Sequence, residues 1–170
     1  MGLGETGEIV CSGPQIFTGY WNNPDATRAA FIEHDGKRIF RTGDLGRYDE
    51  DGYFFIVDRL KRMINASGFK VWPAEVEAMM FAHPDIQEAC VIGVRDAYRG
   101  ETVKAVVVLK GASRNAVRAQ DIIEWCKGHM AAYKCPRMVE LVDALPKSAT
   151  GKVMWRALQE QESARAASKA

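Results

Sequence analysis

Residues 58–77 constrain the fold of this chain more than any other segment. Within twenty residues they combine a charged link, a short β pattern, a glycine turn and a helix opened by Pro73. Four of the five residues 58–62 are charged, and such a run is in general typical of a solvated connector. Here it separates two stretches of unlike character, residues 1–57 and the residues from 63 onward. This position favours a hinge between two domains.

Residues 1–57 carry the pattern of short strands and turns. We expect a strand at 8–11 and one short helix over 24–32, which begins with a proline. Turn residues at 34–37 and 49–52 predict two β-hairpins. The segment has few large apolar side chains for its length, so it would bury little surface alone. We therefore expect it to be the edge of a larger domain.

Residues 63–170 carry longer apolar runs, which predict a domain with its own core. A hairpin should turn at Ser67-Gly68, and an acidic helix should begin at Pro73. The other expected elements are strands at 89–94 and 103–109 around a polar loop at 95–101, a helix over 119–130, a strand at 138–142 and a last helix from about 153. The tail 163–170 lacks apolar anchors and is expected to fray. These elements predict a compact α+β domain with a small mixed β-sheet and packing helices.

The composition is that of an ordinary globular protein, with 47% hydrophobic and 26% charged residues. A net charge of +1 provides no field that would recruit nucleic acid or an anionic membrane. The longest apolar run, 103–109, is interrupted by Lys104 and is far shorter than the ~20 residues of a spanning helix. The four cysteines form no CxxC pair, and the N-terminus does not resemble a secretory leader. We therefore expect a cytoplasmic protein with free thiols, no transmembrane segment and no nucleic-acid partner.

Three short segments are candidates for chemistry. Thr42-Gly43-Asp44 predicts a β-turn, and a carboxylate held by a tight turn can also accept hydrogen bonds from two ribose hydroxyls. Gly68 is the expected hairpin turn residue, where a missing Cβ also allows a ligand to approach the backbone. Lys152 stands just before a predicted helix, where its charge opposes the helix dipole. A mobile surface cation is the simpler interpretation of Lys152, but such local conflicts are tolerated more often at functional sites.

Two other kinds of site are not expected. Gly151-Lys152 does not form a P-loop, because Pro146 stands where the first glycine would be and Val153 replaces the serine or threonine. The three histidines have no spacing suited to a metal site, so no metal-ligating residue is predicted.

Three blocks of the sequence, at 41–45, 58–77 and 145–152, resemble signature segments of the adenylate-forming enzymes and stand in the same order. That group contains acyl-CoA synthetases, luciferases and peptide-synthetase adenylation domains. The resemblance implies that residues 1–57 are the C-terminal edge of the large adenylating domain, 58–62 the hinge, and 63–170 the mobile C-terminal domain. The implied fold is this small α+β domain, preceded by a β-rich remnant of the large N-terminal domain.

The same resemblance implies a role for each candidate residue. Asp44 would bind the ribose of ATP and AMP, and Arg59 would lie near the ribose and phosphates. Lys61 would be the hinge pivot. Gly68 would let a thiol ligand pass close to the backbone when the small domain rotates. Lys152 would be the catalytic lysine, which bridges the carboxylate of the acid and the α-phosphate during adenylation.

The chain also departs from the family pattern in places. Many relatives have glycine where this chain has Asp58, and some have aspartate at the pivot position of Lys61. Asn65 stands where some relatives carry a lysine that is active in the second half-reaction, so that role is not carried over.

The segment around Trp72-Pro73 is most similar to fatty or aryl acyl-CoA ligases. The resemblance therefore implies the C-terminal portion of an AMP-forming acyl-CoA synthetase, which activates a carboxylic acid, in the first instance a fatty acid. Its cofactors would be ATP/AMP, CoA and Mg²⁺, with the magnesium ligands outside these residues. Its partners would be the acid, CoA and the large N-terminal domain, and a homo-oligomer is left open. The chain contains no Gly/Ser/Thr-rich phosphate loop, so the isolated chain is expected to be inactive.

Other functions are compatible with the same sequence. The domain could serve as a stand-alone, non-enzymatic module that binds a nucleotide or a protein. It could also be a fragment of a luciferase-like or peptide-synthetase adenylation enzyme. Retention of Asp44, Arg59 and Lys152 together favours a truncated enzyme, because a pure binding module has less reason to keep all three.

Overall fold

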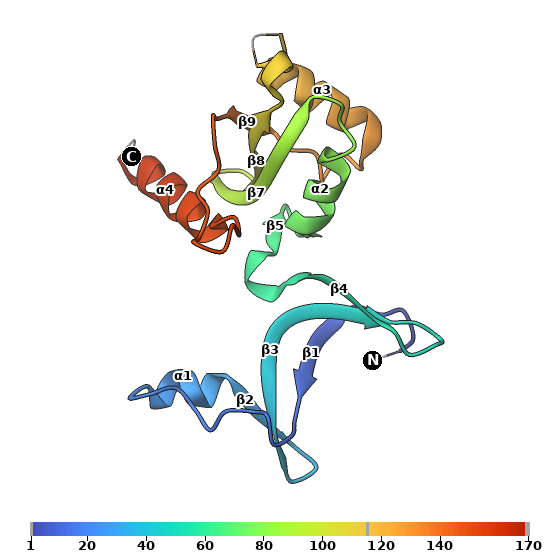
Figure 1. Cartoon of the computed structure of the whole chain (residues 1–170), viewed down its shortest axis with the longest axis vertical. Helices are drawn as coiled ribbons and strands as arrows, with labels where there is room; N and C mark the ends of the chain where they lie inside the picture. Colours follow the sequence, from blue (N-terminus) through green and yellow to red (C-terminus); the bar gives the residue numbers. More distant parts are fainter. Residues whose placement is uncertain (1, 115, 169–170) are drawn as a thin grey trace. The chain divides into compact units, whose positions relative to one another are not determined.

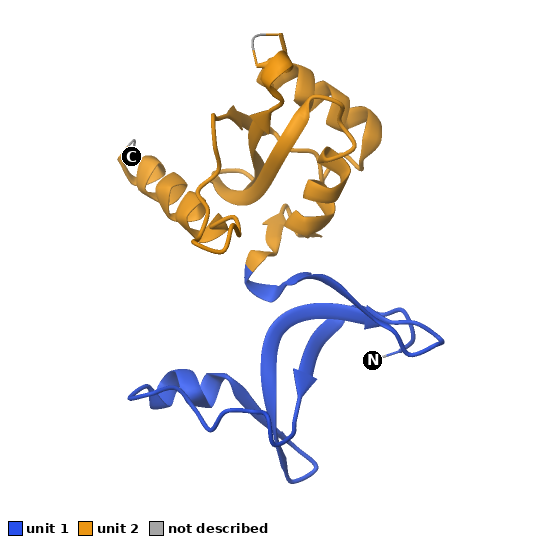
Figure 2. Ribbon diagram, viewed as in Figure 1, with its two compact units in different colours: residues 1–61 blue, residues 62–170 orange. Residues whose placement is uncertain are grey.

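A computed structural model of the chain describes residues 2–114 and 116–168. The chain divides into two compact units, unit 1 over residues 1–61 and unit 2 over residues 62–170 (Figure 2). Each unit has its own β-sheet, shown in Figure 1. The described residues contain no helix with the length and apolar character needed to cross a membrane.

Unit 1 is a four-stranded antiparallel sheet built around one long strand. Its elements are β1 (Gly7–Cys11), α1 (Pro24–Ala29), β2 (Phe31–His34), β3 (Lys37–Tyr48) and β4 (Phe54–Arg59). Strand β3 pairs with each of the other three strands. Asp35 and Gly36 have positive φ at the β2–β3 turn, which confirms the hairpin predicted there.

Helix α1 is shorter than the sequence suggested. Asn23 caps it by accepting a hydrogen bond from the backbone of Ala26, and the helix ends at Ala29. Phe31 and Ile32, which were expected in the helix, instead begin β2 and pair with the neighbouring strand β3. Aromatic and β-branched side chains favour a strand when a partner strand is present, and this tertiary pairing overrides the helical pattern.

Unit 1 buries little apolar surface. Among its described residues, Leu45 is the only large apolar side chain that is fully buried. A cluster of half-exposed aromatic rings forms the remaining packing, in which Phe17 contacts Phe31 and Phe40 with centroids 5.5 and 5.2 Å apart. Phe54 and Ile56 of β4 are exposed. Unit 1 therefore has only a thin apolar core of its own.

Unit 2 is the α+β domain that the sequence predicted. Its elements are β5 (Ile64–Ala66), β6 (Phe69–Val71), α2 (Pro73–Met80), β7 (Ile86–Asp96), β8 (Gly100–Leu109), α3 (Ala119–His129), β9 (Met138–Leu141) and α4 (Trp155–Ala167). The strands lie in the order β6-β5-β8-β7, and β9 also pairs with β8. The β8–β9 pairing is parallel while the others are antiparallel, which confirms a mixed sheet.

The central strand β8 contributes to a core on each face of the sheet, because alternate side chains point to opposite sides. On one face Val103 and Val107 pack in a cluster that includes Val76 of α2 and Ile122 of α3. The other face forms a second cluster, in which Val106 and Val108 pack with Leu145 and Leu158. This second face carries α4 and the segment that leads into it.

Three boundaries in unit 2 differ from the prediction. Pairing of β7 with β8 continues to Asp96 and Gly100, so the polar loop is shorter than 95–101. Helix α4 begins at Trp155 rather than near Val153. It continues to Ala167, whereas the tail 163–170 was expected to fray; residues 169–170 lie outside the described residues. An ion pair between Arg165 and Glu140 holds the last turns, and this long-range contact is not visible in the local sequence.

Candidate functional site

Asp44 lies in a β-bulge of β3 rather than in the tight turn that the sequence suggested. Glu8 pairs with Leu45 and Val10 pairs with Arg41, so three residues of β3, 42–44, face one residue of β1. Gly43 adopts a φ of 73°, which favours glycine and permits the bulge. Bulges of this kind redirect side chains at the edge of a ladder, and here the bulge contains the carboxylate of Asp44.

Two side chains brace this bulge. The Glu8 carboxylate receives hydrogen bonds from Arg41 at 2.7 and 2.9 Å and from the Gly43 backbone at 3.1 Å. The Thr42 hydroxyl donates to the carbonyl of Ile9 at 2.6 Å and accepts from the Asp44 backbone at 3.0 Å. Glu8 therefore has a structural role, which is to fix the backbone that carries Asp44.

Asp44 and Arg59 are brought together by the β3–β4 pairing. They are directly opposite in register, and the Arg59 Nε lies 2.8 Å from Asp44 Oδ1. The Arg59 side chain is 60% exposed and that of Asp44 is 29% exposed. A carboxylate can accept about four hydrogen bonds, so the pair leaves acceptor capacity on Asp44 for hydroxyl groups. Next to it stands a planar cation suited to a phosphate.

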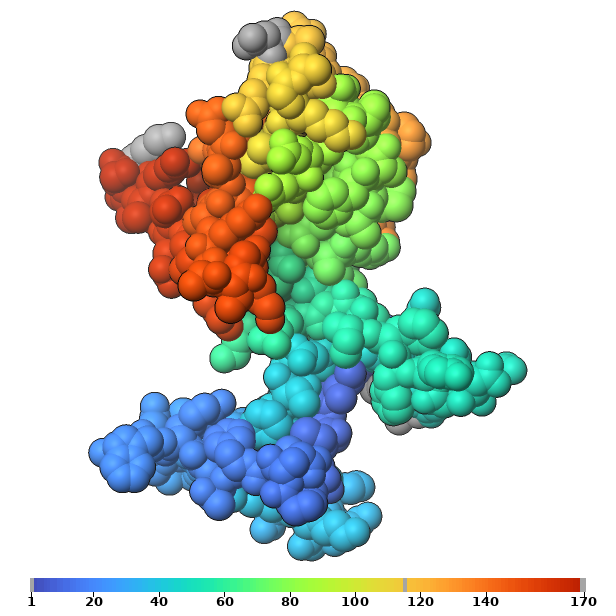
Figure 3. Space-filling view, viewed as in Figure 1, coloured from blue at the N-terminus to red at the C-terminus, as the bar shows by residue number. Residues whose placement is uncertain are grey.

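Lys152 lies in a compact turn of unit 2. Lys147 and Val153 form an antiparallel bridge, and the backbone of Ser148 donates to the carbonyl of Lys152 at 2.9 Å. Gly151 has a φ of 79° and donates to the carbonyl of Ser148 at 2.9 Å. The segment between β9 and α4 lies on the surface of unit 2, where its orange-red atoms are visible in Figure 3. The turn thus holds the backbone of Lys152 while its side chain is exposed.

The two lysines of this turn differ in their partners. Lys147 forms an ion pair with Glu88 at 2.8 Å, which ties the turn to β7. Among residues 2–114 and 116–168, no carboxylate pairs with the ammonium of Lys152. An exposed lysine on a well-ordered turn, without an internal counter-ion, is suited to neutralise negative charge on a ligand.

Gly68 forms the turn of the β5–β6 hairpin, as predicted. Ser67 and Gly68 have φ values of 55° and 88°, and the Gly68 N–H donates to the Asn65 side chain at 3.0 Å. A Cβ placed on Gly68 would meet no atom within 4 Å. The residue lines an open cavity of about 650 Å³, whose rim carries both basic and acidic side chains, among them Arg95, Arg99 and Glu101.

Lys61 lies in a short 3₁₀ turn, η1 (Leu60–Arg62), and is exposed. The next residue, Arg62, is anchored in unit 2. It donates to Glu77 Oε1 at 2.5 Å, and its guanidinium lies 5.7 Å from the centre of the Trp155 ring. Glu77 Oε1 also accepts from the backbone of Val91 at 2.8 Å. The expected pivot therefore lies directly before a residue that is firmly attached to α2, β7 and α4.

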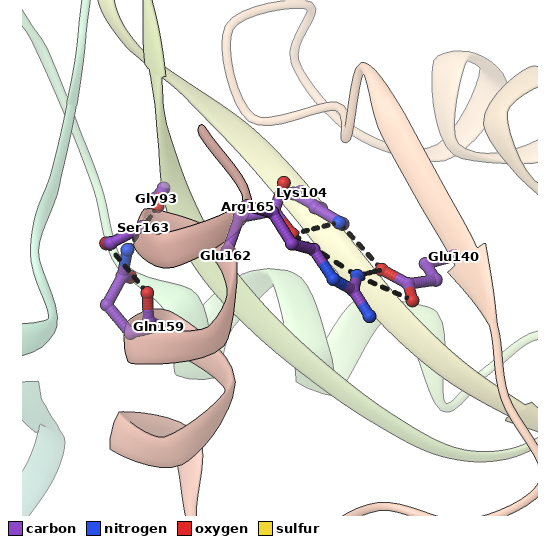
Figure 4. A network of polar contacts seen from close by, with 7 residues as sticks. All are labelled: Gly93, Lys104, Glu140, Gln159, Glu162, Ser163 and Arg165. Carbon is purple, nitrogen blue, oxygen red and sulfur yellow. Dashed lines mark hydrogen bonds and ion pairs between the residues drawn. The ribbon is translucent and has the colours of Figure 1, made fainter. Parts of the chain in front are cut away.

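A buried ionic network in unit 2 was missed by the sequence analysis. The Lys104 ammonium lies 2.7 Å from Glu140 and 2.6 Å from Glu162, and Arg165 also contacts both carboxylates (Figure 4). Burial lowers the pKa of Lys104, but the hydrogen bonds that its ammonium donates to the two carboxylates outweigh this, so its pKa is raised above the usual value. The one sequence signal was the interruption of the apolar run 103–109 by a lysine.

Cys90 and Cys126 are buried and are poorly suited to act as nucleophilic thiols. Burial raises the pKa of the Cys90 thiol to about 12 and that of Cys126 to about 11, so both remain protonated at neutral pH. Within the described part of the chain, no three histidine, cysteine or acidic side chains come together as a metal site.

Comparison with known proteins gives consistent matches. Residues 75–152 match the family model of the AMP-binding enzyme C-terminal domain. These residues therefore form an AMP-binding enzyme C-terminal domain. The chain is 44% identical over 158 residues to a long-chain-fatty-acid–CoA ligase of Bacillus subtilis, covering 93% of this chain and 27% of that protein. A feruloyl-CoA synthase of an Amycolatopsis species is also 44% identical, over 151 residues, covering 89% of this chain and 30% of the relative.

Solved structures of this family have the same fold. ATP-bound MatB from Rhodopseudomonas palustris superposes with a TM-score of 0.85 at 37% sequence identity, covering 95% of this chain and 31% of that one. The chain therefore spans less than a third of the length of the adenylate-forming enzymes that it matches here. The α+β class and the family membership expected from the sequence are both confirmed.

Proposed function

We propose that this chain is the C-terminal portion of an AMP-forming acid–CoA ligase. In the first step, a carboxylate oxygen attacks the α-phosphorus of ATP and pyrophosphate leaves. In the second, the sulfur of CoA attacks the carbonyl carbon of the acyl-adenylate, the thiol proton is lost and AMP leaves. The curated relatives are named as CoA ligases and synthases, which supports this reaction class.

The observation that carries the proposal is the state of Lys152. It is exposed on a closed turn, has no internal counter-ion among the described residues, and stands at the last residue of the family match. Two anions must approach each other during adenylation, the carboxylate and the α-phosphate. A compact ammonium placed beside both lowers that repulsion more in the transition state than in the separated reactants.

Asp44 and Arg59 would act on the nucleotide. The carboxylate of Asp44 accepts hydrogen bonds from the ribose hydroxyls, while Arg59 provides positive charge for the phosphates. The ion pair between them, at 2.8 Å, orients the carboxylate before the nucleotide binds. Glu8 supports this arrangement indirectly, since it fixes the bulge that contains Asp44.

The proposed cofactors are ATP, AMP and CoA, with Mg²⁺ bound by residues outside this chain. The acid is of the fatty or aryl class, since relatives named for both kinds share 44% identity with the chain. Gly68 would serve the second step, because its missing Cβ leaves open space where the thiol arm of CoA can pass the backbone.

Separate single-turnover measurements of the two steps test the proposal, in the full-length ligase that contains this chain. We expect Lys152→Ala to slow adenylation by ~10²–10³-fold. Thioester formation from supplied acyl-adenylate should stay near the wild-type rate, because the lysine acts only while the carboxylate attacks. Lys127→Ala, at an exposed lysine of α3 away from this turn, is the control for loss of a surface cation, and the 170-residue chain alone, which lacks a phosphate loop, is the negative control.

An adenylation rate unchanged by Lys152→Ala would show that the residue is a mobile surface cation. Pyrophosphate exchange by the 170-residue chain alone would contradict the assignment of the phosphate site to another part of the enzyme. Absence of a large domain from the encoding reading frame would instead favour the stand-alone binding module.

A further inference from the structure

Lys104 is an unusual residue for the centre of a sheet. It lies on β8 among buried apolar side chains, and its own side chain is only 7% exposed. Burying a charge in such a place is costly unless the charge is paired and hydrogen-bonded. On the same face of β8, Val106 and Val108 pack under Leu145 and Leu158, so Lys104 points toward α4 and the segment before it.

The partners of Lys104 come from two different elements. Glu140 belongs to β9 and lies 2.7 Å from the ammonium, while Glu162 belongs to α4 and lies 2.6 Å away. Arg165 of α4 contacts both oxygens of Glu140 at 3.0 Å. Figure 4 shows the ammonium and the guanidinium converging on these carboxylates. The network thus joins β8, β9 and α4 at one point.

Those two elements are the flanks of the segment that carries Lys152. Strand β9 ends at Leu141 and α4 begins at Trp155, so the turn with Lys152 lies between them. Glu140 is fixed just before the segment, and Glu162 and Arg165 are fixed after it. Gln159 adds a further tie, since its Nε2 donates to the carbonyl of Gly93 at 2.6 Å.

Apolar contacts alone attach α4 weakly. Leu158 is the one residue of this helix that is buried, and the flanking contacts come from half-buried Trp155 and Val153. Burial of a single leucine contributes about 1.5–3 kcal/mol, which is little for holding a thirteen-residue helix in one place. The orientation of α4 therefore depends largely on polar contacts, which are the ionic network and the hydrogen bond from Gln159.

We propose that Lys104 is a positioning residue for adenylation: by joining Glu140 and Glu162 it holds β9 and α4 together and thereby sets the place of Lys152. This inference rests on the proposed function of Lys152. Lys104 itself touches no substrate, being buried beneath α4. Because a misplacement of about 1 Å in a catalytic group can cost ~10²-fold in rate, the network matters even if the fold survives its loss.

The test compares both half-reactions in the full-length ligase for Lys104→Met, Glu162→Gln and the conservative Lys104→Arg. We expect Lys104→Met to slow adenylation by ~10-fold or more while thioester formation stays within about twofold. Lys104→Arg, which keeps a cation between the carboxylates, should restore most of the rate. Lys127→Met, which removes an exposed lysine paired with Glu124 on α3, is the matched control and should change neither step.

A second measurement uses the 170-residue chain itself. In Lys104→Met, hydrogen exchange of the amides of Gly151 and Met154 should become faster, while the β7–β8 amides keep their protection. Glu162→Gln, a milder change, should show the same pattern to a smaller extent.

The outcomes separate the two hypotheses. If Lys152→Ala slows adenylation but Lys104→Met does not, the positioning role is overturned and the proposed function of Lys152 stands. An equal decline of both half-reactions in Lys104→Met, without rescue by Lys104→Arg, would reduce Lys104 to a stability residue and also overturn it. If the adenylation rate of Lys152→Ala equals that of the wild type, both the proposed function and this inference are overturned.

Discussion

Gly68 is held in a backbone conformation that other residues rarely adopt. Its φ is 88°, and the space where a Cβ would lie is open. A substitution at Gly68 would therefore lower stability through backbone strain and lower activity by obstructing a ligand. It would not cause a clash inside the fold. Strain at such a position is of the order of 1–3 kcal/mol.

Gly68→Ala should consequently impair the second half-reaction of the full-length ligase. We expect thioester formation to fall by ~10-fold or more, with adenylation nearly unaffected, because the added methyl group lies on the proposed path of the thiol. Gly36→Ala is a matched control, since Gly36 also has a positive φ and open space but lies at a hairpin with no proposed role. Equal effects of the two changes would show that strain alone is responsible.

The junction of β9 and α4 is an element whose stability should depend on pH. The hydrogen bond from Lys104 lowers the pKa of the Glu140 carboxyl below 4.5; burial opposes this and Arg165 adds to it. A carboxyl whose pKa is depressed by folding stabilises the fold above its unfolded pKa, and this contribution is lost as pH falls through the folded value. Glu162 and Arg165 face the same carboxyl from α4.

Glu140→Gln should therefore destabilise unit 2 at neutral pH and have little effect in acid. We expect the free energy of unfolding to fall by about 1–3 kcal/mol at pH 7, because a charged hydrogen-bond acceptor is lost. The difference from wild type should shrink as pH drops below about 4.5, and urea titrations followed by tryptophan fluorescence would measure it. Glu124→Gln is the control, since Glu124 forms an exposed ion pair with Lys127 on α3. It should leave the midpoint of urea unfolding nearly unchanged. A stability difference between variant and wild type that does not narrow as pH falls below 4.5 would contradict the assignment.

At the scale of the whole molecule, Lys61 is the proposed pivot about which the C-terminal domain rotates between the two half-reactions. Lys61 is exposed in a short 3₁₀ turn, while Arg62 after it is fixed by Glu77. A pivot of this kind needs a freely variable residue next to a fixed one, so that rotation is concentrated at one position.

Lys61→Pro should restrict that rotation. Proline fixes φ near −65°, which is close to the φ of the 3₁₀ turn that contains Lys61, so the turn should accept it while rotation at this position is hindered. In the full-length ligase we expect thioester formation from acyl-adenylate to fall while adenylation is spared. Lys61→Ala removes the side chain without fixing φ and should behave like wild type. Equal loss of both steps in the proline variant would place the pivot elsewhere.

The sequence by itself determined the element types and the family. Proline and glycine positions marked the start of α2 and the β5–β6 hairpin, and short apolar runs marked β7 and β8. These features follow from local backbone preferences and side-chain periodicity, which a sequence carries directly. The blocks around Asp44, Lys61 and Lys152 carried the family resemblance for the same reason, since each is a short contiguous segment.

Only the tertiary structure decided how distant residues combine. The bulge at Asp44 requires Glu8 from another strand, and α4 continues past residue 163 because Arg165 meets Glu140. Lys104 showed in the sequence only as an interruption of an apolar run; its partners lie 36 and 58 positions further along the chain. Pairing energies of buried charges depend on distance in space and on exclusion of water, and neither quantity is encoded in local sequence order.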